Sequence, residues 1–169
     1  METVAIFVDV QNIYYTTRQA WGRHFDYFSF WREATKNRQV VTAIAYAIDR
    51  GDVKQQKFQD ILRRIGFEVK LKPYIQRSDG SAKGDWDAGI TLDVMEYAAQ
   101  ADTIVLASGD GDFDLLLQRA KQRFGVTTEV YGVPQLTADS LSQSATRFFP
   151  IQDQLLQNHS KNTNSPHLK

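Results

Sequence analysis

Short apolar runs alternate with amphipathic segments along most of this 169-residue chain. Runs rich in β-branched residues predict strands at 4–8, 40–48, 67–75, 103–107 and 127–131. Apolar side chains at helical spacing predict helices at 13–21, 28–36, 54–65 and 114–124, and a further helix that begins at Asp87. The alternation of strand and helix predicts an α/β fold, a three-layer α/β/α sandwich around a mostly parallel central sheet.

Polar stretches separate these elements and mark the end of the predicted packed region. Lysines alternate with apolar residues in the run at 67–75, so we expect that strand near an edge of the sheet, and 147–151 is expected to form a last edge strand. The stretch 76–84 is predicted to be a polar loop. We expect one domain over 1–152, followed by a polar tail at 153–169 that is disordered.

Charge and cysteine content narrow the class of protein. Lys plus Arg and Asp plus Glu each number 20, so no global basic field attracts nucleic acid, and any such binding would need a local patch. The absence of cysteine excludes disulfides, zinc–thiolate sites and thiol catalysis. No apolar run approaches about 18 residues and the N-terminus lacks a signal-peptide pattern, which favours a soluble, cytoplasmic protein without membrane contact.

Three carboxylates alternate shortly after the apolar run at 103–107, at Asp110, Asp112 and Asp114. They lie at the carboxyl end of the predicted strand, where open α/β sheets bind their ligands. Like charges this close repel one another, which favours a bound cation or a raised pKa, and oxygen ligands alone suit Mg²⁺ or Mn²⁺. A solvated acidic turn, with Asp112 capping a helix, is the alternative that this stretch leaves open. A calcium loop is excluded, because Leu115 and Lys121 stand where that loop needs Gly and Glu.

Other polar side chains stand at the ends of further predicted elements. Asp9 directly follows the strand at 4–8, and Asn12 comes three residues later, although Asp9 could also serve only as a helix N-cap. Asp87 opens a helix and lies on the same buried face as Ile90. Asp93 lies about 120° round this helix from Asp87, so it could be a metal ligand, or it could lie at the surface or behind the ligands. If the first and fourth predicted strands are neighbours, Asp9, Asp87 and Asp110 converge, which predicts a metal site.

Four sequence blocks in this order resemble the NYN domain, in particular its LabA-like bacterial branch within the PIN-like nuclease superfamily. The blocks are Phe7-Val8-Asp9-Val10-Gln11-Asn12, Lys83-Gly84-Asp85-Trp86-Asp87, Leu92-Asp93 and Ser108-Gly109-Asp110-Gly111-Asp112-Phe113. The resemblance implies a PIN-like sandwich and a metal-dependent ribonuclease. It implies a catalytic set of Asp9, Asn12, Asp87, Asp110 and Asp112, whose four carboxylates are the metal ligands. Asp93 also falls on an acidic position of the pattern, whereas many members of the branch carry a non-acidic residue where this chain has Asp114.

The predicted reaction is hydrolysis of a phosphodiester bond, since bound Mg²⁺ or Mn²⁺ acidifies a water molecule and stabilises charge on the phosphate. Ser108 is expected to hydrogen-bond a phosphate or the attacking water, and Lys83 to bind a flanking phosphate. Single-stranded RNA is the favoured partner, because unstacked bases could meet Tyr14, Tyr15 or Trp86.

Other functions compete with this hypothesis. A non-cleaving RNA- or protein-binding module would explain the neutral net charge, although it would not need all four acids. A phosphatase of the haloacid-dehalogenase type is disfavoured, because it places its Asp-x-Asp after the first strand, where this chain has Asp9-Val10-Gln11. A response-regulator receiver is disfavoured as well, because it needs paired acids at the same place. A sheet edge near Phe148 and Phe149 could also pair two copies of the chain as a homodimer.

Overall fold

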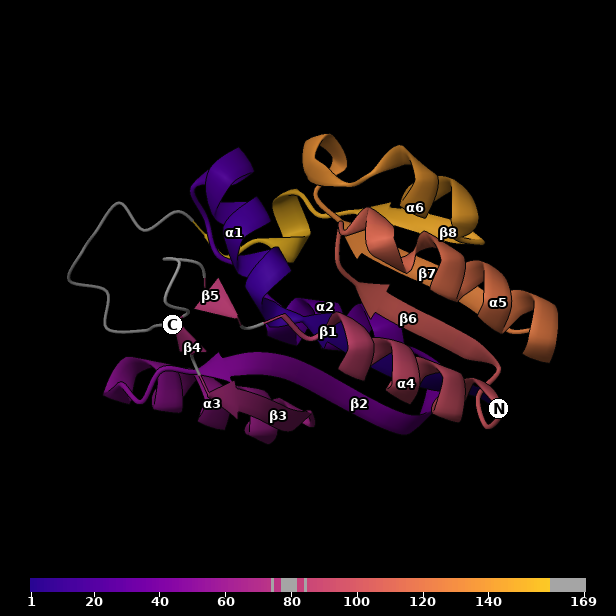
Figure 1. The fold of residues 1–169 in the computed structure, drawn as a ribbon, viewed down its shortest axis with the longest axis horizontal. Coiled ribbons are helices and arrows are strands. Elements are labelled where there is room, and N and C mark those ends of the chain that lie inside the picture. The colour runs from indigo at the N-terminus through magenta and orange to yellow at the C-terminus, as the bar shows by residue number, and fades with distance from the viewer. Residues whose placement is uncertain (74, 77–81, 84, 159–169) are drawn as a thin grey trace.

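The computed structural model describes residues 1–73, 75–76, 82–83 and 85–158. Its centre is a six-stranded sheet in the order β3-β2-β1-β6-β7-β8, with every neighbouring pair parallel (Figure 1). The strands are β1 (Glu2–Asp9), β2 (Arg38–Asp49), β3 (Glu68–Pro73), β6 (Thr103–Ala107), β7 (Thr127–Gly132) and β8 (Arg147–Pro150). The chain builds outward from β1 to β3 and then crosses back to β6, so the strand order reverses between β1 and β6.

Helices cover both faces of this sheet and give the predicted three layers. One core contains side chains from α1 (Val10–Trp21), α2 (Tyr27–Thr35) and α3 (Val53–Ile65). The other contains side chains from α4 (Asp87–Ala98), α5 (Asp114–Phe124) and α6 (Asp139–Ser144). The α/β sandwich expected from the sequence is therefore confirmed, and the described strands of its central sheet are all parallel.

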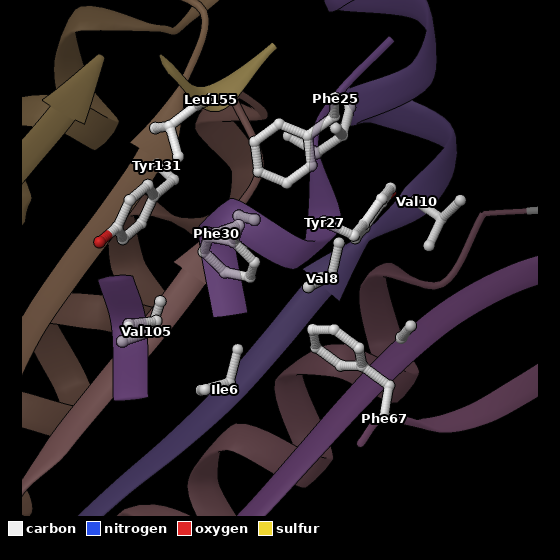
Figure 2. Close-up of a cluster of buried hydrophobic side chains, with 14 of the residues drawn as sticks. Ile6, Val8, Val10, Phe25, Tyr27, Phe30, Phe67, Val105, Tyr131 and Leu155 are labelled. Atoms are coloured by element: carbon white, nitrogen blue, oxygen red, sulfur yellow. The ribbon is translucent and has the colours of Figure 1, made fainter. Parts of the chain in front are cut away.

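Alternation along β1 divides its side chains between the two cores. Val4, Ile6 and Val8 belong to the first core, whereas Ala5 and Phe7 belong to the second. Figure 2 shows the first core, in which several aromatic rings surround the aliphatic side chains of β1. This double burial explains why β1 reads as a continuous apolar run.

Several predicted elements agree closely with the observed ones. β6 and α5 have the predicted bounds, and β3 and β8 lie at the two edges of the sheet as expected. Phe149 of β8 stacks on Tyr131 with ring centroids 4.8 Å apart, so this ring packs within its own chain. The suggested pairing of two copies at this edge stays a prediction.

The region after β3 differs from the predicted strand and polar loop. β3 ends at Pro73, which has no N–H to extend the ladder. Two short strands then pair antiparallel: β4 (Ile75–Gln76) spans the end of the predicted strand and the start of the predicted loop, and β5 (Ala82–Lys83) lies within that loop. Residues 77–81 and 84 of that stretch lie outside the described residues.

The beginning of the predicted tail packs against the domain. Asp153–Leu155 forms a 3-10 turn, and the side chains of Leu155 and Leu156 are buried in the first core. Their apolar side chains explain why the packed chain continues beyond residue 152. The expectation of disorder for 159–169 concerns residues outside the described part. Among the described residues, no helix is long and apolar enough to cross a membrane.

Candidate metal centre

Three carboxylates meet at the carboxyl edge of the sheet, where the strand order reverses. Asp9 ends β1, Asp110 follows β6, and Asp87 opens α4. Each offers one oxygen that lies within 4.8 Å of the oxygens of the other two. We call Asp9, Asp87 and Asp110 the acidic trio. It occupies the position where open α/β sheets form their ligand crevices.

The pairing of β1 with β6 accounts for this convergence. Val8 lies opposite Ala107 in the parallel ladder, so the residues that follow them are neighbours. The Ser108 hydroxyl donates to Asp9 Oδ2 at 3.2 Å and accepts from the backbone N–H of Asp110 at 3.1 Å. Ser108 is fully buried. Its position therefore orients two members of the acidic trio, and its predicted contact with a phosphate or the attacking water stays a prediction.

Asn12 joins α1 to the acidic turn. Its side-chain Oδ1 accepts a hydrogen bond from the Gly109 backbone N–H at 2.9 Å. A Cβ at Gly109 would lie 2.7 Å from the Leu136 carbonyl oxygen, so only glycine lets the turn pack this closely. Asp9 Oδ1 also accepts from the Asn12 backbone N–H at 3.5 Å, which makes Asp9 the N-cap of α1 as well as a member of the acidic trio.

Burial and mutual repulsion raise the pKa of two of these carboxyls. The pKa of Asp9 rises to about 6, mainly through burial and further through the charges of Asp110 and Asp85, although hydrogen bonds from Asn12 and Ser108 oppose the rise. The pKa of Asp87 also rises to about 6, first through burial and then through the charges of neighbouring aspartates, Asp110 foremost. Clustered carboxylates that resist ionisation, with only oxygen donors, fit a divalent cation such as Mg²⁺ or Mn²⁺.

The other predicted acids lie around the acidic trio. Asp112 is exposed in the 3-10 turn Gly111–Phe113, where its backbone N–H donates to Asp110 Oδ1 at 2.9 Å, so Asp110 is the capping residue of this turn. Asp112 lies outside the acidic trio, yet its charge contributes to the raised pKa of Asp87. Asp114 accepts a hydrogen bond from the backbone N–H of Leu115 in the first turn of α5. Exposed Asp85 accepts from the Asp87 N–H at 3.3 Å and adds to the negative charge.

Asp93 makes contacts that differ from those of the acidic trio. Its Oδ2 accepts from the Tyr46 hydroxyl and from the Lys70 ammonium, each at 2.8 Å. It therefore ties α4 to β2 and β3, and its charge is compensated by Lys70. Sequence reasoning left the role of Asp93 open and missed Tyr46 and Lys70 as its partners. The lysines at every second position of β3 were the available signal.

Trp86 fixes the segment that carries Asp87. Its indole Nε1 donates to the Ala47 carbonyl at 2.9 Å, and its ring lies 5.3 Å from the Tyr46 ring. The Lys72 ammonium lies 4.6 Å from its ring centroid, and a Cβ at Gly89 would approach the ring to 2.6 Å. These contacts place Trp86 as an anchor between the Asp87 segment and β2. Lys83 lies in β5, and its predicted phosphate contact stays a prediction.

Comparisons with known proteins come from sequence and from structure. The model of the NYN domain family matches residues 3–152. Low amplitude and bright protein LabA from Synechococcus elongatus is 30% identical over 164 residues, which covers 89% of this chain and 84% of that protein. The crystal structure of a protein of unknown function, VPA0982 from Vibrio parahaemolyticus, superposes with a TM-score of 0.89 at 56% identity, covering 92% of this chain and 96% of that one.

Proposed function

Since the chain belongs to the NYN domain family, within its LabA-like branch, we propose that it is a metal-dependent ribonuclease that hydrolyses phosphodiester bonds in single-stranded RNA. The observation that carries this proposal is the acidic trio at the reversal of strand order. The family supports a substrate related to RNA, and the oxygen-only donor set supports Mg²⁺ or Mn²⁺ as the cofactor.

The residues of the chain divide the work of the proposed reaction. Asp9, Asp87 and Asp110 are the proposed metal ligands, and exposed Asp112 supplies a further carboxylate at the rim. A divalent cation in this position supplies Lewis-acid chemistry, which acidifies a water molecule and neutralises developing charge on the phosphate. Ser108 and Asn12 orient Asp9 and the acidic turn through the hydrogen bonds described above. Without a cation, the carboxylates repel a phosphodiester, so we expect cleavage to require added metal.

Purified protein incubated with single-stranded RNA tests this proposal. The reactions contain Mn²⁺, Mg²⁺ or a chelator, and the variant Asp110→Asn is compared with Asp102→Asn. Asp102 is a matched acid that accepts hydrogen bonds from Thr3 near the amino ends of β1 and β6, away from the acidic trio. We expect metal-dependent cleavage by the wild type and by Asp102→Asn, and its loss in Asp110→Asn. Cleavage in chelator, or cleavage that survives Asp110→Asn, would contradict the proposed site.

A second candidate is a non-cleaving module that binds RNA or a protein partner on the same fold. The balance of 20 basic and 20 acidic side chains favours it, because the chain has no excess positive charge to attract a long polyanion. Such a module would bind its partner equally well with metal, with chelator and after Asp110→Asn. The same set of samples, measured for binding as well as for cleavage, separates the two candidates.

A further inference from the structure

Aromatic rings form a row on the solvent side of α1. The side chains of Tyr14 and Tyr15 are 40% and 50% exposed, and their rings meet edge to face with centroids 5.4 Å apart. The His24 ring stacks on Tyr14 at 5.9 Å with an interplanar angle of 23°. Arg18 lies over Tyr14, its guanidinium carbon 6.0 Å from the ring centroid. We call Tyr15, Tyr14 and His24 the aromatic row.

The aromatic row begins beside the acidic trio. α1 starts at the residue after Asp9, and Asn12 contacts the acidic turn through Gly109. Tyr15 follows Asn12 by three residues, so the two side chains are neighbours on the helix surface, about 5 Å apart along the axis. The far end of α1 is fixed near β8, where the Trp21 indole donates to the Ile151 carbonyl at 3.1 Å. α1 therefore runs from the acidic trio toward β8 (Figure 1), and Tyr14 and Tyr15 lie side by side in its first half.

The fold itself gives no reason for these exposed rings. α1 buries Val10, Ile13 and Thr17 against the first core, whereas Tyr14 and Tyr15 lie outside that core. Polar side chains at these two positions would satisfy the amphipathic helix equally well. Two neighbouring exposed tyrosines beside a candidate active site are typical of surfaces on which nucleobases stack.

The charge of the surroundings favours stacking as the source of binding energy. The edge of the sheet is strongly acidic, and the chain as a whole has no net charge, so a polyanion gains little from long-range attraction. Stacking of a base on an aromatic ring does not depend on net charge. Arg18, beside Tyr14, adds a local cation that suits a phosphate or a base face.

We propose that the aromatic row is a nucleobase subsite that binds unpaired bases next to the phosphodiester at the acidic trio. This inference rests on the proposed function and specifies its substrate class as a strand with unstacked bases. Paired bases in a duplex are already stacked on their neighbours, so a duplex cannot offer its base faces to the row. Stacking also accepts every base, so the subsite discriminates between unpaired and paired strands more than between sequences.

Fluorescence anisotropy with a labelled single-stranded RNA dodecamer in chelator measures this binding without cleavage. All the variants keep the acidic trio, so its repulsion of phosphate is the same in every comparison. The variants are Tyr15→Ala, Tyr15→Leu and Tyr15→Trp, with Phe28→Ala as the matched control. Phe28 is a 58% exposed ring that pairs with Arg32 on α2, as Tyr14 pairs with Arg18. We expect Tyr15→Ala and Tyr15→Leu to raise Kd about 5- to 100-fold, Tyr15→Trp to restore it, and Phe28→Ala to leave it unchanged. Thermal melting of each variant confirms its fold.

Changes in the nucleic acid complete the test. A dodecamer that keeps its phosphates but lacks bases should bind about as weakly to the wild type as the intact dodecamer binds to Tyr15→Ala. A duplex of the same sequence should also bind weakly, and single-stranded DNA tests whether the 2′-hydroxyl contributes. Equal binding of the base-free strand, or equal losses in Tyr15→Ala and Phe28→Ala, would overturn the subsite.

Failure of this inference is distinguishable from failure of the proposed function. If metal-dependent cleavage is lost in Asp110→Asn while Tyr15→Ala binds and cuts like the wild type, the nuclease stands and the subsite falls. If the wild type does not cut but Tyr15→Ala loses affinity for single strands, the subsite stands on a binding module.

Discussion

Replacement of Asp9 by asparagine should make the metal-free protein more stable at about pH 8. Burial holds the pKa of Asp9 at about 6, against 3.8 for an unperturbed aspartate. This rise corresponds to about 3 kcal/mol that the folded state loses when the carboxyl ionises. Asparagine keeps the side-chain oxygen that caps α1 but disturbs the hydrogen bond from Ser108, a cost of about 1 kcal/mol. The expected net gain is about 2 kcal/mol, or a rise in Tm of about 4–8 °C for a chain of this size.

The pH dependence of this gain follows from the direction of the pKa change. Folded Asp9 binds its proton more tightly than the unfolded residue does, so its favourable contribution is complete below about pH 4 and is lost as the pH rises through about 6. Asp9→Asn should therefore be more stable than the wild type at about pH 8, whereas at about pH 4 the gain is nearly lost and the disturbed Ser108 hydrogen bond leaves a net cost of up to about 1 kcal/mol.

Urea denaturation in chelator, followed by tryptophan fluorescence at both pH values, measures the free energy of unfolding. Asp102→Asn is a control of opposite sign, because hydrogen bonds from Thr3 lower the pKa of Asp102 and its ionised form is favoured on folding. A variant Asp9→Asn that is less stable than the wild type at about pH 8, or equally shifted at both pH values, would refute the reasoning.

Three further predictions concern the metal, one packing contact and one buried ion pair. Mn²⁺ or Mg²⁺ at about 100 times its Kd should stabilise the wild type by about 2.7 kcal/mol and leave Asp9→Asn unchanged, as differential scanning fluorimetry can show. Gly89→Ala should cost about 1–3 kcal/mol in urea denaturation, because its Cβ would lie 2.6 Å from the Trp86 ring and must displace it; an unchanged midpoint would contradict this packing. Arg38→Met should cost about 3 kcal/mol, because it removes the closer arginine partner of the buried Glu129 carboxylate, at 2.8 Å, and leaves it Arg147 at 3.5 Å; adding Glu129→Leu should recover much of the loss.

The family comparison and the geometry of the site concern the same part of the chain. The NYN match extends over residues 3–152, and the acidic trio draws on three separate sequence blocks within that range. The Vibrio protein shares the fold over nearly the whole of both chains. The proposed ribonuclease therefore depends on chemistry that cleavage and metal-binding assays can test directly.

Local sequence patterns determined the elements and the positions of the acids. The apolar run at 103–107 and the helical spacing at 114–124 predicted β6 and α5 with their observed bounds, because burial on both faces of a strand leaves a continuous apolar run and burial of one stripe of a helix leaves a helical period. Asp9 and Asp110 could be placed at strand ends for the same reason. The β4–β5 pair was missed, because two-residue strands are too short to carry any period.

Only the tertiary structure decided which of these residues meet. The pairing of β1 with β6 joins segments about 100 positions apart and brings Asp9 beside Ser108, and no local pattern specifies that choice. The same holds for Asp93, whose spacing left a ligand role and an outer role both open, and whose carboxylate accepts hydrogen bonds from Tyr46 and Lys70 on two other strands. Sequence periodicity reports which face of an element is buried. The partner on that face depends on how the chain crosses over the sheet, and that crossing is fixed only when both cores pack together.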